Sequence, residues 1–386
     1  MKTKLIGLFG IIAILGLASF FQPVQAATQP NMGEDLPLCL PGIYPVDPGD
    51  CLPLGPSETL KELKMAGINP STLPLPAFVP DADLSELPVH IARIDSSGPV
   101  PVYANLDAAI NGGEALRVLA AGPMRYVTVV NRYTGGGRSL VQMDTGEWVE
   151  ANPIYSWNRF QGLEFTRTPT TDFGWAVNPA ISYQKPGFDQ VMTGKEYPKY
   201  HLFQIYQVQT VGDYEWYRIG PDEWVNSLKA RRVHPDPTPP EGVTGDRWIA
   251  INLDDQVLTA YEKGRLKFAS LITTGIEPFY TQPGTFQIYQ RYDTVTMQDA
   301  YEADRSDFYH LQGVPWVQFY DRNIAIHGIY WPVMLGFPQS HGCVNMTPGD
   351  ANWLYHWAKE GDWVHVWDPS GKTPLDSPLY GGSNRE

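Results

Sequence analysis

Two histidines and a cysteine lie close together near the C-terminal end of this 386-residue sequence. His327 is followed by a glycine, and the segment Ser340-His-Gly-Cys-Val-Asn345 contains His341 and Cys343. A cysteine acts as a nucleophile in its thiolate form, and histidine is the side chain best suited to remove the thiol proton near neutral pH. The sequence therefore predicts thiol chemistry at Cys343, with a histidine supplying the base.

The spacing of these residues is compatible with one shared site. His341 and Cys343 alternate, so on an extended segment both side chains point to the same side. His327 lies at the end of an expected strand, and the loop that follows can bring it against the other two. Gly342 leaves room for a substrate backbone to approach closely. The three side chains lack the Cys-x-x-Cys or His-Glu-x-x-His spacing of zinc sites, so we expect no metal.

These residues carry a family resemblance. Ser340-His-Gly-Cys-Val-Asn345, preceded by His327-Gly328, resembles the signature of the L,D-transpeptidase (YkuD-like) catalytic family. The similarity covers about residues 246–368, roughly a third of the chain.

Two flanking features agree with this resemblance. The alternating runs 248–253 and 256–262 are similar to the first hairpin of the family. Thr281-Gln-Pro-Gly-Thr-Phe286 resembles its Thr-Pro-x-Gly-x-Phe element, with the proline one place later, at Pro283.

The resemblance implies a role for each residue at the core of the motif. Cys343 would be the nucleophile and His327 the general base and acid. The backbone carbonyl of Gly328 would orient His327, and N–H groups around Gly342 and Cys343 would stabilise the oxyanion. His341 would line the site near the thiol, although a structural hydrogen-bonding role for it is an open alternative.

The resemblance also implies a shell around these groups. Ser340 and Asn345 would hold the catalytic loop through hydrogen bonds. Tyr330 and Trp331 would wall the substrate groove, whereas without the family both aromatics would be assigned to the core.

The implied activity is acyl transfer on the stem peptides of peptidoglycan. The Cys343 thiolate would attack the carbonyl of the third stem residue, D-alanine would leave, and an amine of an acceptor stem would take the acyl group in a 3→3 crosslink. No metal or organic cofactor is needed, and carbapenems would acylate Cys343. Two alternatives are open: an L,D-carboxypeptidase that uses water as acceptor, and a non-catalytic cell-wall-binding protein. The oligomeric state is also open.

The elements that must position this site are mainly β. We expect a β-sandwich or partly rolled sheet over residues 246–368, with one or two helices. Strands are predicted over residues 248–253, 256–261, 266–273, 286–291, 324–327 and 363–367, and a helix over 348–360. A Pro-rich linker over 236–245 precedes this domain, and a polar tail follows over 369–386.

Residues 89–235 read as further short strands separated by Gly, Pro and Asn turns. The tripeptide Glu-Trp-Val recurs at 147–149 and 223–225, which predicts a duplicated small β-barrel. This pattern resembles the Src-homology-3-like modules that accompany cell-wall enzymes, and the region is a candidate for wall binding.

The N-terminal segment predicts export. Residues 1–26 combine two lysines, an apolar run and a small residue at Ala26, as in a cleaved signal peptide; an uncleaved anchor is the alternative. Residues 27–88 form a Pro- and Gly-rich lead segment, in which Cys39 and Cys51 are expected to form a disulfide rather than remain free.

Charge excludes one class of partner. The formal net charge is −14 at pH 7, so the chain lacks the basic footprint that nucleic acid requires. Beyond the export signal, no stretch is apolar enough to span a membrane, and nothing favours an anionic membrane surface as partner.

Overall fold

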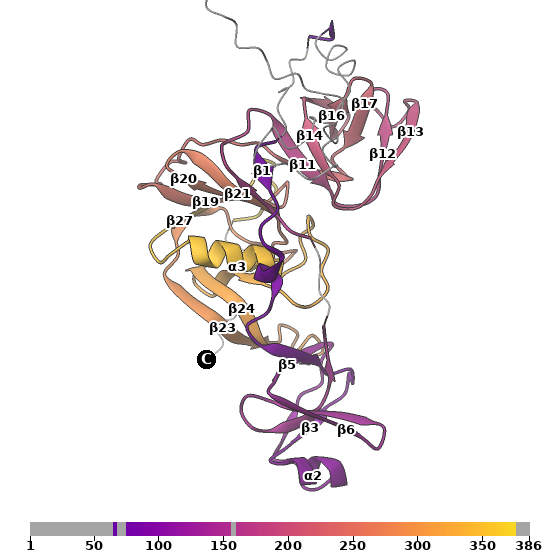
Figure 1. The fold of residues 1–386 in the computed structure, drawn as a ribbon, viewed down its shortest axis with the longest axis vertical. Coiled ribbons are helices and arrows are strands. Elements are labelled where there is room, and N and C mark those ends of the chain that lie inside the picture. Colours follow the sequence, from indigo (N-terminus) through magenta and orange to yellow (C-terminus); the bar gives the residue numbers. More distant parts are fainter. Residues whose placement is uncertain (1–64, 68–74, 156–159, 376–386) are drawn as a thin grey trace, which may run out of the picture. The chain divides into compact units, whose positions relative to one another are not determined.

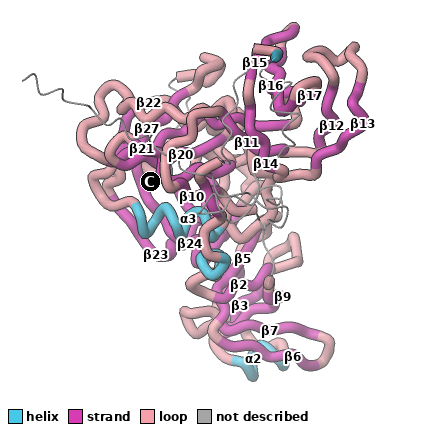
Figure 2. The backbone as a smooth tube through the Cα atoms, turned by 45° about the horizontal axis from the view of Figure 1, so that its top comes forward, coloured by secondary structure: helices cyan, strands magenta, loops and turns pink. Residues whose placement is uncertain are grey.

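The structure is a computed structural model that describes residues 65–67, 75–155 and 160–375. The expected export signal, the Cys39–Cys51 pair and the end of the polar tail lie outside these residues. The described part is mainly β, as predicted (Figures 1 and 2). Its helices do not include any that is long and apolar enough to cross a membrane.

Two sheets enclose the C-terminal region. The strands of the first sheet, in spatial order, are β1 (Ala77–Phe78), β10 (Leu163–Phe165), β21 (Arg265–Leu271), β20 (Val257–Glu262), β19 (Arg247–Asn252), β27 (Trp363–Trp367) and β22 (Gly284–Gln287). Those of the second are β26 (Val344–Met346), β25 (Ile324–Gly328), β24 (Tyr309–Asp321), β5 (Met124–Val129), β2 (His90–Arg93) and β9 (Asn152–Pro153), with β23 (Gln290–Asp299) paired to β24.

The helix α3 (Pro348–Trp357) packs on the second sheet, and Figure 1 shows it between the ribbons of β19–β21 and β23–β24. The Thr347 hydroxyl caps its start by accepting the Asp350 N–H at 3.3 Å, and Pro348 occupies a first-turn position that needs no N–H donor. The helix ends at Trp357 rather than at residue 360 as predicted, because Ala358 is already extended.

The hairpin β19–β20 shows how the local sequence sets the strand register. The side-chain oxygen of Asn252 accepts the backbone N–H groups of Asp254 and Asp255 at 3.0 and 3.1 Å, which closes the turn. Trp248 then lies opposite Tyr261, and their rings stack with centroids 5.0 Å apart.

The long pair β23–β24 was not predicted. Gly313 and Pro315 interrupt the β24 pattern, and Trp316 adopts a positive φ of 58° within the strand. These residues interrupt the alternation of apolar and polar side chains by which a strand is predicted from sequence. The register is irregular where the two strands pass this point.

The upstream residues contain two series of eight strands with the same order. The first repeat (residues 90–153) contains the series β2 to β9, and the second repeat (residues 172–233) contains β11 to β18. The sheet β4-β3-β8-β7-β6 of the first matches β13-β12-β17-β16-β15 of the second, and β5-β2-β9 matches β14-β11-β18. Their likeness to Src-homology-3-like modules, and wall binding by them, stay predictions.

The strands of the repeats not yet placed have the following bounds. In the first repeat they are β3 (Val100–Tyr103), β4 (Arg117–Leu119), β6 (Asn131–Gly135), β7 (Arg138–Gln142) and β8 (Trp148–Glu150), with the helix α2 (Leu106–Asn111). In the second repeat they are β11 (Asp172–Ala176), β12 (Ala180–Tyr183), β13 (Met192–Tyr197), β14 (Leu202–Ile205), β15 (Gln207–Val211), β16 (Tyr214–Gly220), β17 (Glu223–Asn226) and β18 (Ala230–Val233).

The predicted boundary near residue 246 does not separate the sheets. β5 of the first repeat pairs in parallel with β24, so that Met124 lies opposite Tyr309. β1 and β10 extend the first sheet beyond β21. Part of the predicted lead segment and part of the 89–235 region therefore belong to the two sheets of the C-terminal region, where they cover strand edges that would otherwise be open.

Candidate active site

A cavity of about 550 Å³ opens beside β25 and β26. Six residues singled out from the sequence line it: His327, Trp331, Ser340, His341, Cys343 and Asn345. The remaining predicted residues, Gly328, Tyr330 and Gly342, are not part of its lining.

The two parallel strands bring His327 and Cys343 together. In their register His327 lies opposite Asn345, and Cys343 stands two residues before Asn345. Residues two apart on a strand point to the same face, and the offset is roughly 7 Å along the strand, with the strands about 4.8 Å apart. His327 and Cys343 therefore share one face and one cavity.

The His327 ring is neutral and fixed in one tautomer. Its Nδ1 lies 3.0 Å from the carbonyl oxygen of Gly328. Because a carbonyl only accepts, Nδ1 carries the proton and Nε2 keeps its lone pair. Burial lowers the pKa of His327 to about 4, against a smaller raising effect of this hydrogen bond. At neutral pH the ring is uncharged.

The thiol is also neutral at rest. Burial raises the pKa of Cys343 to about 11, and a backbone hydrogen bond from Ala325 only partly offsets this rise. The Sγ atom lies 4.0 Å from the carbonyl oxygen of Asn323. At neutral pH the pair is therefore a thiol and an uncharged imidazole that line the same cavity.

Hydrogen bonds around Ser340 hold the loop that precedes β26. Its hydroxyl donates to the carbonyl oxygen of Cys343 at 2.6 Å and accepts the Gly342 N–H at 3.2 Å. The hydroxyl of Thr281 donates to the Gly342 carbonyl oxygen at 2.6 Å. Gly342 has a φ of 112°, which suits glycine alone. The Gly342 N–H, which we expected to serve the oxyanion, is thus directed to Ser340.

Asn345 contributes in two ways. Its backbone exchanges hydrogen bonds with Thr273, at 3.0 and 2.8 Å, and ties β26 to the end of the first sheet. Its side-chain oxygen is buried and, among the described residues, finds no hydrogen-bond partner. The residue is also part of the cavity lining.

His341 lies in an aromatic cage. Phe279 meets it edge-on with centroids 4.5 Å apart, Tyr301 lies at 4.7 Å, and Tyr309 stacks on it at 5.7 Å. Burial lowers the pKa of His341, while the charge of Asp307 raises it. His341 is thus a neutral wall of the cavity.

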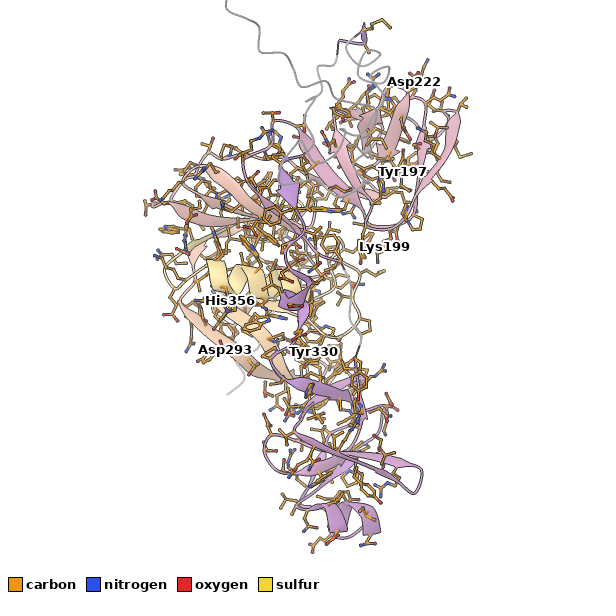
Figure 3. All side chains as sticks on the ribbon, viewed as in Figure 1. Tyr197, Lys199, Asp222, Asp293, Tyr330 and His356 are labelled. Carbon is orange, nitrogen blue, oxygen red and sulfur yellow. The ribbon has the colours of Figure 1, made fainter. Side chains whose placement is uncertain are left out.

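The two predicted groove aromatics differ. Trp331 lines the cavity, with its ring 6.0 Å from that of His327. Tyr330 does not: it is buried in the core, where its hydroxyl donates to the Gln312 carbonyl oxygen at 2.6 Å (Figure 3). The assignment of Tyr330 to the groove is wrong: its ring packs edge-on against that of Trp331, with centroids 5.0 Å apart, and only Trp331 of this buried pair lines the cavity.

Several cavity residues were missed. Tyr301 and Tyr309 come from the β23–β24 hairpin, and Met124 comes from the first repeat. Asp299 is the one formally charged residue of the described lining. The sequence gives no local pattern that connects Tyr301 or Met124 to the cysteine motif, so neither could be assigned to the cavity. Over the described ranges, no group of three or more His, Cys, Asp or Glu side chains is arranged to hold a metal ion.

Comparison with protein families gives one match. Residues 246–366 match the YkuD model, described as the L,D-transpeptidase catalytic domain. No curated protein matches the sequence.

Solved structures overlap with parts of the chain. An L,D-transpeptidase from Stackebrandtia nassauensis is 25% identical, and the matched part covers 32% of this chain and 57% of that protein, with a TM-score of 0.27. The catalytic domain of the Enterococcus faecium L,D-transpeptidase is 23% identical over 33% of this chain and 100% of its own length, with a TM-score of 0.29. An L,D-transpeptidase from Mycobacterium smegmatis is 15% identical over 54% of this chain and 90% of its own, with a TM-score of 0.31.

The assignment rests on the family model and not on these partial overlaps. The matched region contains β25, β26 and the whole motif from His327 to Asn345. Residues 246–366 of this chain are therefore an L,D-transpeptidase catalytic domain of the YkuD family.

Proposed function

We propose that the chain is a cysteine-dependent L,D-transpeptidase that acts on peptidoglycan stem peptides outside the cytoplasm. One observation carries the proposal: Cys343 and a neutral, Nδ1-protonated His327 face the same cavity from adjacent parallel strands. The match of the surrounding residues to the family model supports it. Stem peptides lie outside the cytoplasm, so the proposal includes export through residues 1–26.

Acylation begins with a proton transfer. As the Cys343 sulfur bonds to the carbonyl carbon of the third stem residue, its proton passes to Nε2 of His327. The carbonyl oxygen becomes an oxyanion, for which the Cys343 N–H is the donor we propose, since the Gly342 N–H donates to Ser340. The C–N bond to D-alanine then breaks, and His327 returns the proton to the leaving amine. A thioester on Cys343 remains.

Deacylation repeats these steps in reverse. The side-chain amine of an acceptor stem attacks the thioester carbonyl and gives a proton to His327. The C–S bond breaks, the sulfur recovers the proton, and an amide links the two stems as a 3→3 crosslink. With water in place of the amine, the same thioester would be hydrolysed, as in an L,D-carboxypeptidase.

The raised pKa of the thiol and the neutral imidazole suit this order of events. A resting thiol with a raised pKa is protected from oxidation and from stray electrophiles. It becomes nucleophilic only when a bound carbonyl and its oxyanion donor make proton transfer to His327 favourable.

The first test is intact mass after incubation with meropenem. The catalytic domain from Enterococcus faecium has been solved acylated by ertapenem, and a related enzyme, LdtMt1, in complex with imipenem. We expect one adduct of the drug mass on the wild type and none on Cys343→Ala. Product analysis with a tetrapeptide donor, with and without an amine acceptor, then separates transpeptidation from hydrolysis. A folded wild type without an adduct would refute the proposal and favour the wall-binding alternative.

A further inference from the structure

The loop between His327 and Ser340 forms one wall of the cavity through Trp331, Val333 and Gln339. It also leads directly into Ser340, whose hydroxyl binds the Cys343 carbonyl oxygen. The position of this loop therefore sets both the shape of the cavity and the seat of the thiol.

One residue of the second repeat reaches this loop. The guanidinium Nε of Arg231 donates to the Gly336 carbonyl oxygen at 2.8 Å, and the group lies 4.8 Å from the centre of the Phe337 ring. The same guanidinium donates to the carbonyl oxygens of Ser227 and Ala230, beside it in the second repeat. Arg231 thus links the β17–β18 corner to the loop by hydrogen bonds and by a cation–π contact.

The loop is shaped to receive this contact. Gly336 has a φ of 86°, and a Cβ at this position would lie 2.3 Å from a methyl carbon of Val177. Leu335, next to it, is fully buried in a core that includes Val177 and Val233 of the second repeat. Only glycine allows the loop to come this close.

The opposite side of the loop is bound to the catalytic sheet. The Gly336 N–H donates to the Ile272 carbonyl oxygen at 2.8 Å. The N–H groups of Gln339 and Ser340 both donate to the Thr274 carbonyl oxygen, at 2.8 and 3.0 Å. The loop is therefore clamped between the end of β21 and the second repeat.

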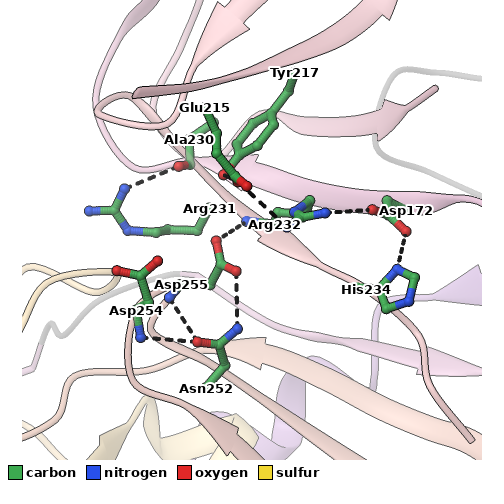
Figure 4. A network of polar contacts seen from close by, with 10 residues as sticks. All are labelled: Asp172, Glu215, Tyr217, Ala230, Arg231, Arg232, His234, Asn252, Asp254 and Asp255. Carbon is green, nitrogen blue, oxygen red and sulfur yellow. Dashed lines mark hydrogen bonds and ion pairs between the residues drawn. The ribbon is translucent and has the colours of Figure 1, made fainter. Parts of the chain in front are cut away.

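A polar network fixes β18 in turn (Figure 4). The backbone N–H of Arg232 donates to the Asp255 carboxylate, in the β19–β20 turn, at 3.0 Å. The Arg232 side chain pairs with Asp172 at 3.2 Å and with Glu215 at 3.5 Å. These contacts hold Arg231 at a defined place relative to the catalytic sheet.

We infer that the second repeat is a positioning element of the active site, and that Arg231 is the positioning residue that seats the cavity wall. This inference rests on the proposed function, because that function makes the cavity the active site. It gives the second repeat a role distinct from wall binding.

The first test compares Arg231→Met with Arg218→Met in the full-length chain. Arg218 is a matched control, because its guanidinium also donates to backbone carbonyls of the second repeat, at Gly220 and Pro221, and lies over an aromatic ring, Trp224. We expect the amides of Gly336, Gln339 and Ser340 to exchange hydrogen about tenfold faster in Arg231→Met only.

The same variant should separate two reactions of Cys343. Acylation by meropenem needs a shaped cavity and should fall by about tenfold or more, since a misplacement of about 1 Å can cost a hundredfold. Alkylation by iodoacetamide needs little beyond the thiol and should change by less than about threefold. Arg231→Lys keeps a charged donor and should recover part of the acylation rate.

Gly336→Ala disturbs the same contact from the loop side. It should likewise slow acylation by meropenem and leave alkylation by iodoacetamide nearly unchanged. Unchanged amide exchange in Arg231→Met, or faster exchange with unchanged acylation, would overturn the inference. Equal losses in Arg218→Met would overturn it as well, because they would reflect general destabilisation. If the wild type forms no adduct, the proposed function fails, and the inference is then decided by the exchange rates alone.

Discussion

The neutral resting state of the Cys343–His327 pair can be tested by the pH dependence of two reactions. The thiol pKa of about 11, against an ordinary value of 9.0, leaves about a hundredfold less thiolate at neutral pH. A more basic thiolate is a better nucleophile, and with a Brønsted slope of about 0.4–0.5 its rate constant for alkylation is about tenfold higher than that of an ordinary thiolate. Alkylation of Cys343 by iodoacetamide should therefore be about tenfold slower than that of a free cysteine.

The shape of the two profiles is the sharper measure. Alkylation requires free thiolate, so its rate should rise about tenfold per pH unit without a plateau below about pH 10. Acylation by meropenem uses His327 as base and should be nearly flat from pH 6 to 8. It should decline only as the pH falls towards about 4, where His327 becomes protonated.

His327→Gln provides the control that separates the two reactions. It should lower acylation by about a hundredfold or more and change alkylation by less than about threefold. Peptide mapping assigns the label to Cys343 and distinguishes it from any label on Cys39 or Cys51. An alkylation plateau reached below pH 7 would refute the reasoning, because it would reveal a preformed thiolate–imidazolium pair.

Three further predictions concern the residues around the site. Met124→Ala should lower the rate of meropenem acylation several-fold with little change in Tm, because Met124 lines the cavity. Met143→Ala, in the core of the first repeat, should lower Tm and leave the acylation rate nearly unchanged. Equal changes of rate and Tm in the two variants would contradict a role of Met124 in the cavity wall. Tyr330→Phe should cost about 1–2 kcal/mol of unfolding free energy in urea titrations and leave acylation unchanged, and a slower acylation would return Tyr330 to the groove. Asp350 accepts hydrogen bonds from the Gly162 N–H and the Ser270 hydroxyl. Burial raises the pKa of its carboxyl to about 6, above the unfolded value of 3.8. The contribution of the protonated carboxyl to folding stability is therefore present at low pH and is lost as pH rises from about 4 to 6. The stability deficit of Asp350→Asn should therefore shrink by about 2 kcal/mol between pH 4 and pH 7, and a deficit that grows with pH would show that the sign is wrong.

The family and the mainly β fold could be predicted because their signals are local. The motif from Ser340 to Asn345 is contiguous, and His327 lies near the end of a strand whose β-branched and apolar residues identify it. Parallel pairing of β25 with β26 then needs only the intervening loop. The sequence could not distinguish Tyr330 from Trp331, because both rings belong to one buried cluster and only the conformation of the loop leaves Trp331 at the edge of the cavity.

The remaining site residues depend on long-range pairing. Met124 reaches the cavity only because β5 pairs with β24, and no periodicity encodes which strands of separate regions pair. Arg231 lies 105 residues before Gly336 in sequence, and neither position carries a motif. The aromatic cage of His341 draws on a hairpin whose second strand is masked in sequence by Gly313 and Pro315.

The strands that upstream residues contribute to the catalytic sheets limit how this protein can be shortened. A recombinant fragment beginning at residue 246 would lack β10, which covers the edge of β21, and β5, which covers part of β24. Bare strand edges recruit strands from other molecules, so we expect such a fragment to be poorly soluble and prone to self-association. A soluble truncation would begin upstream of Ala77, and the boundary of the homologous region is not the boundary of the folding unit.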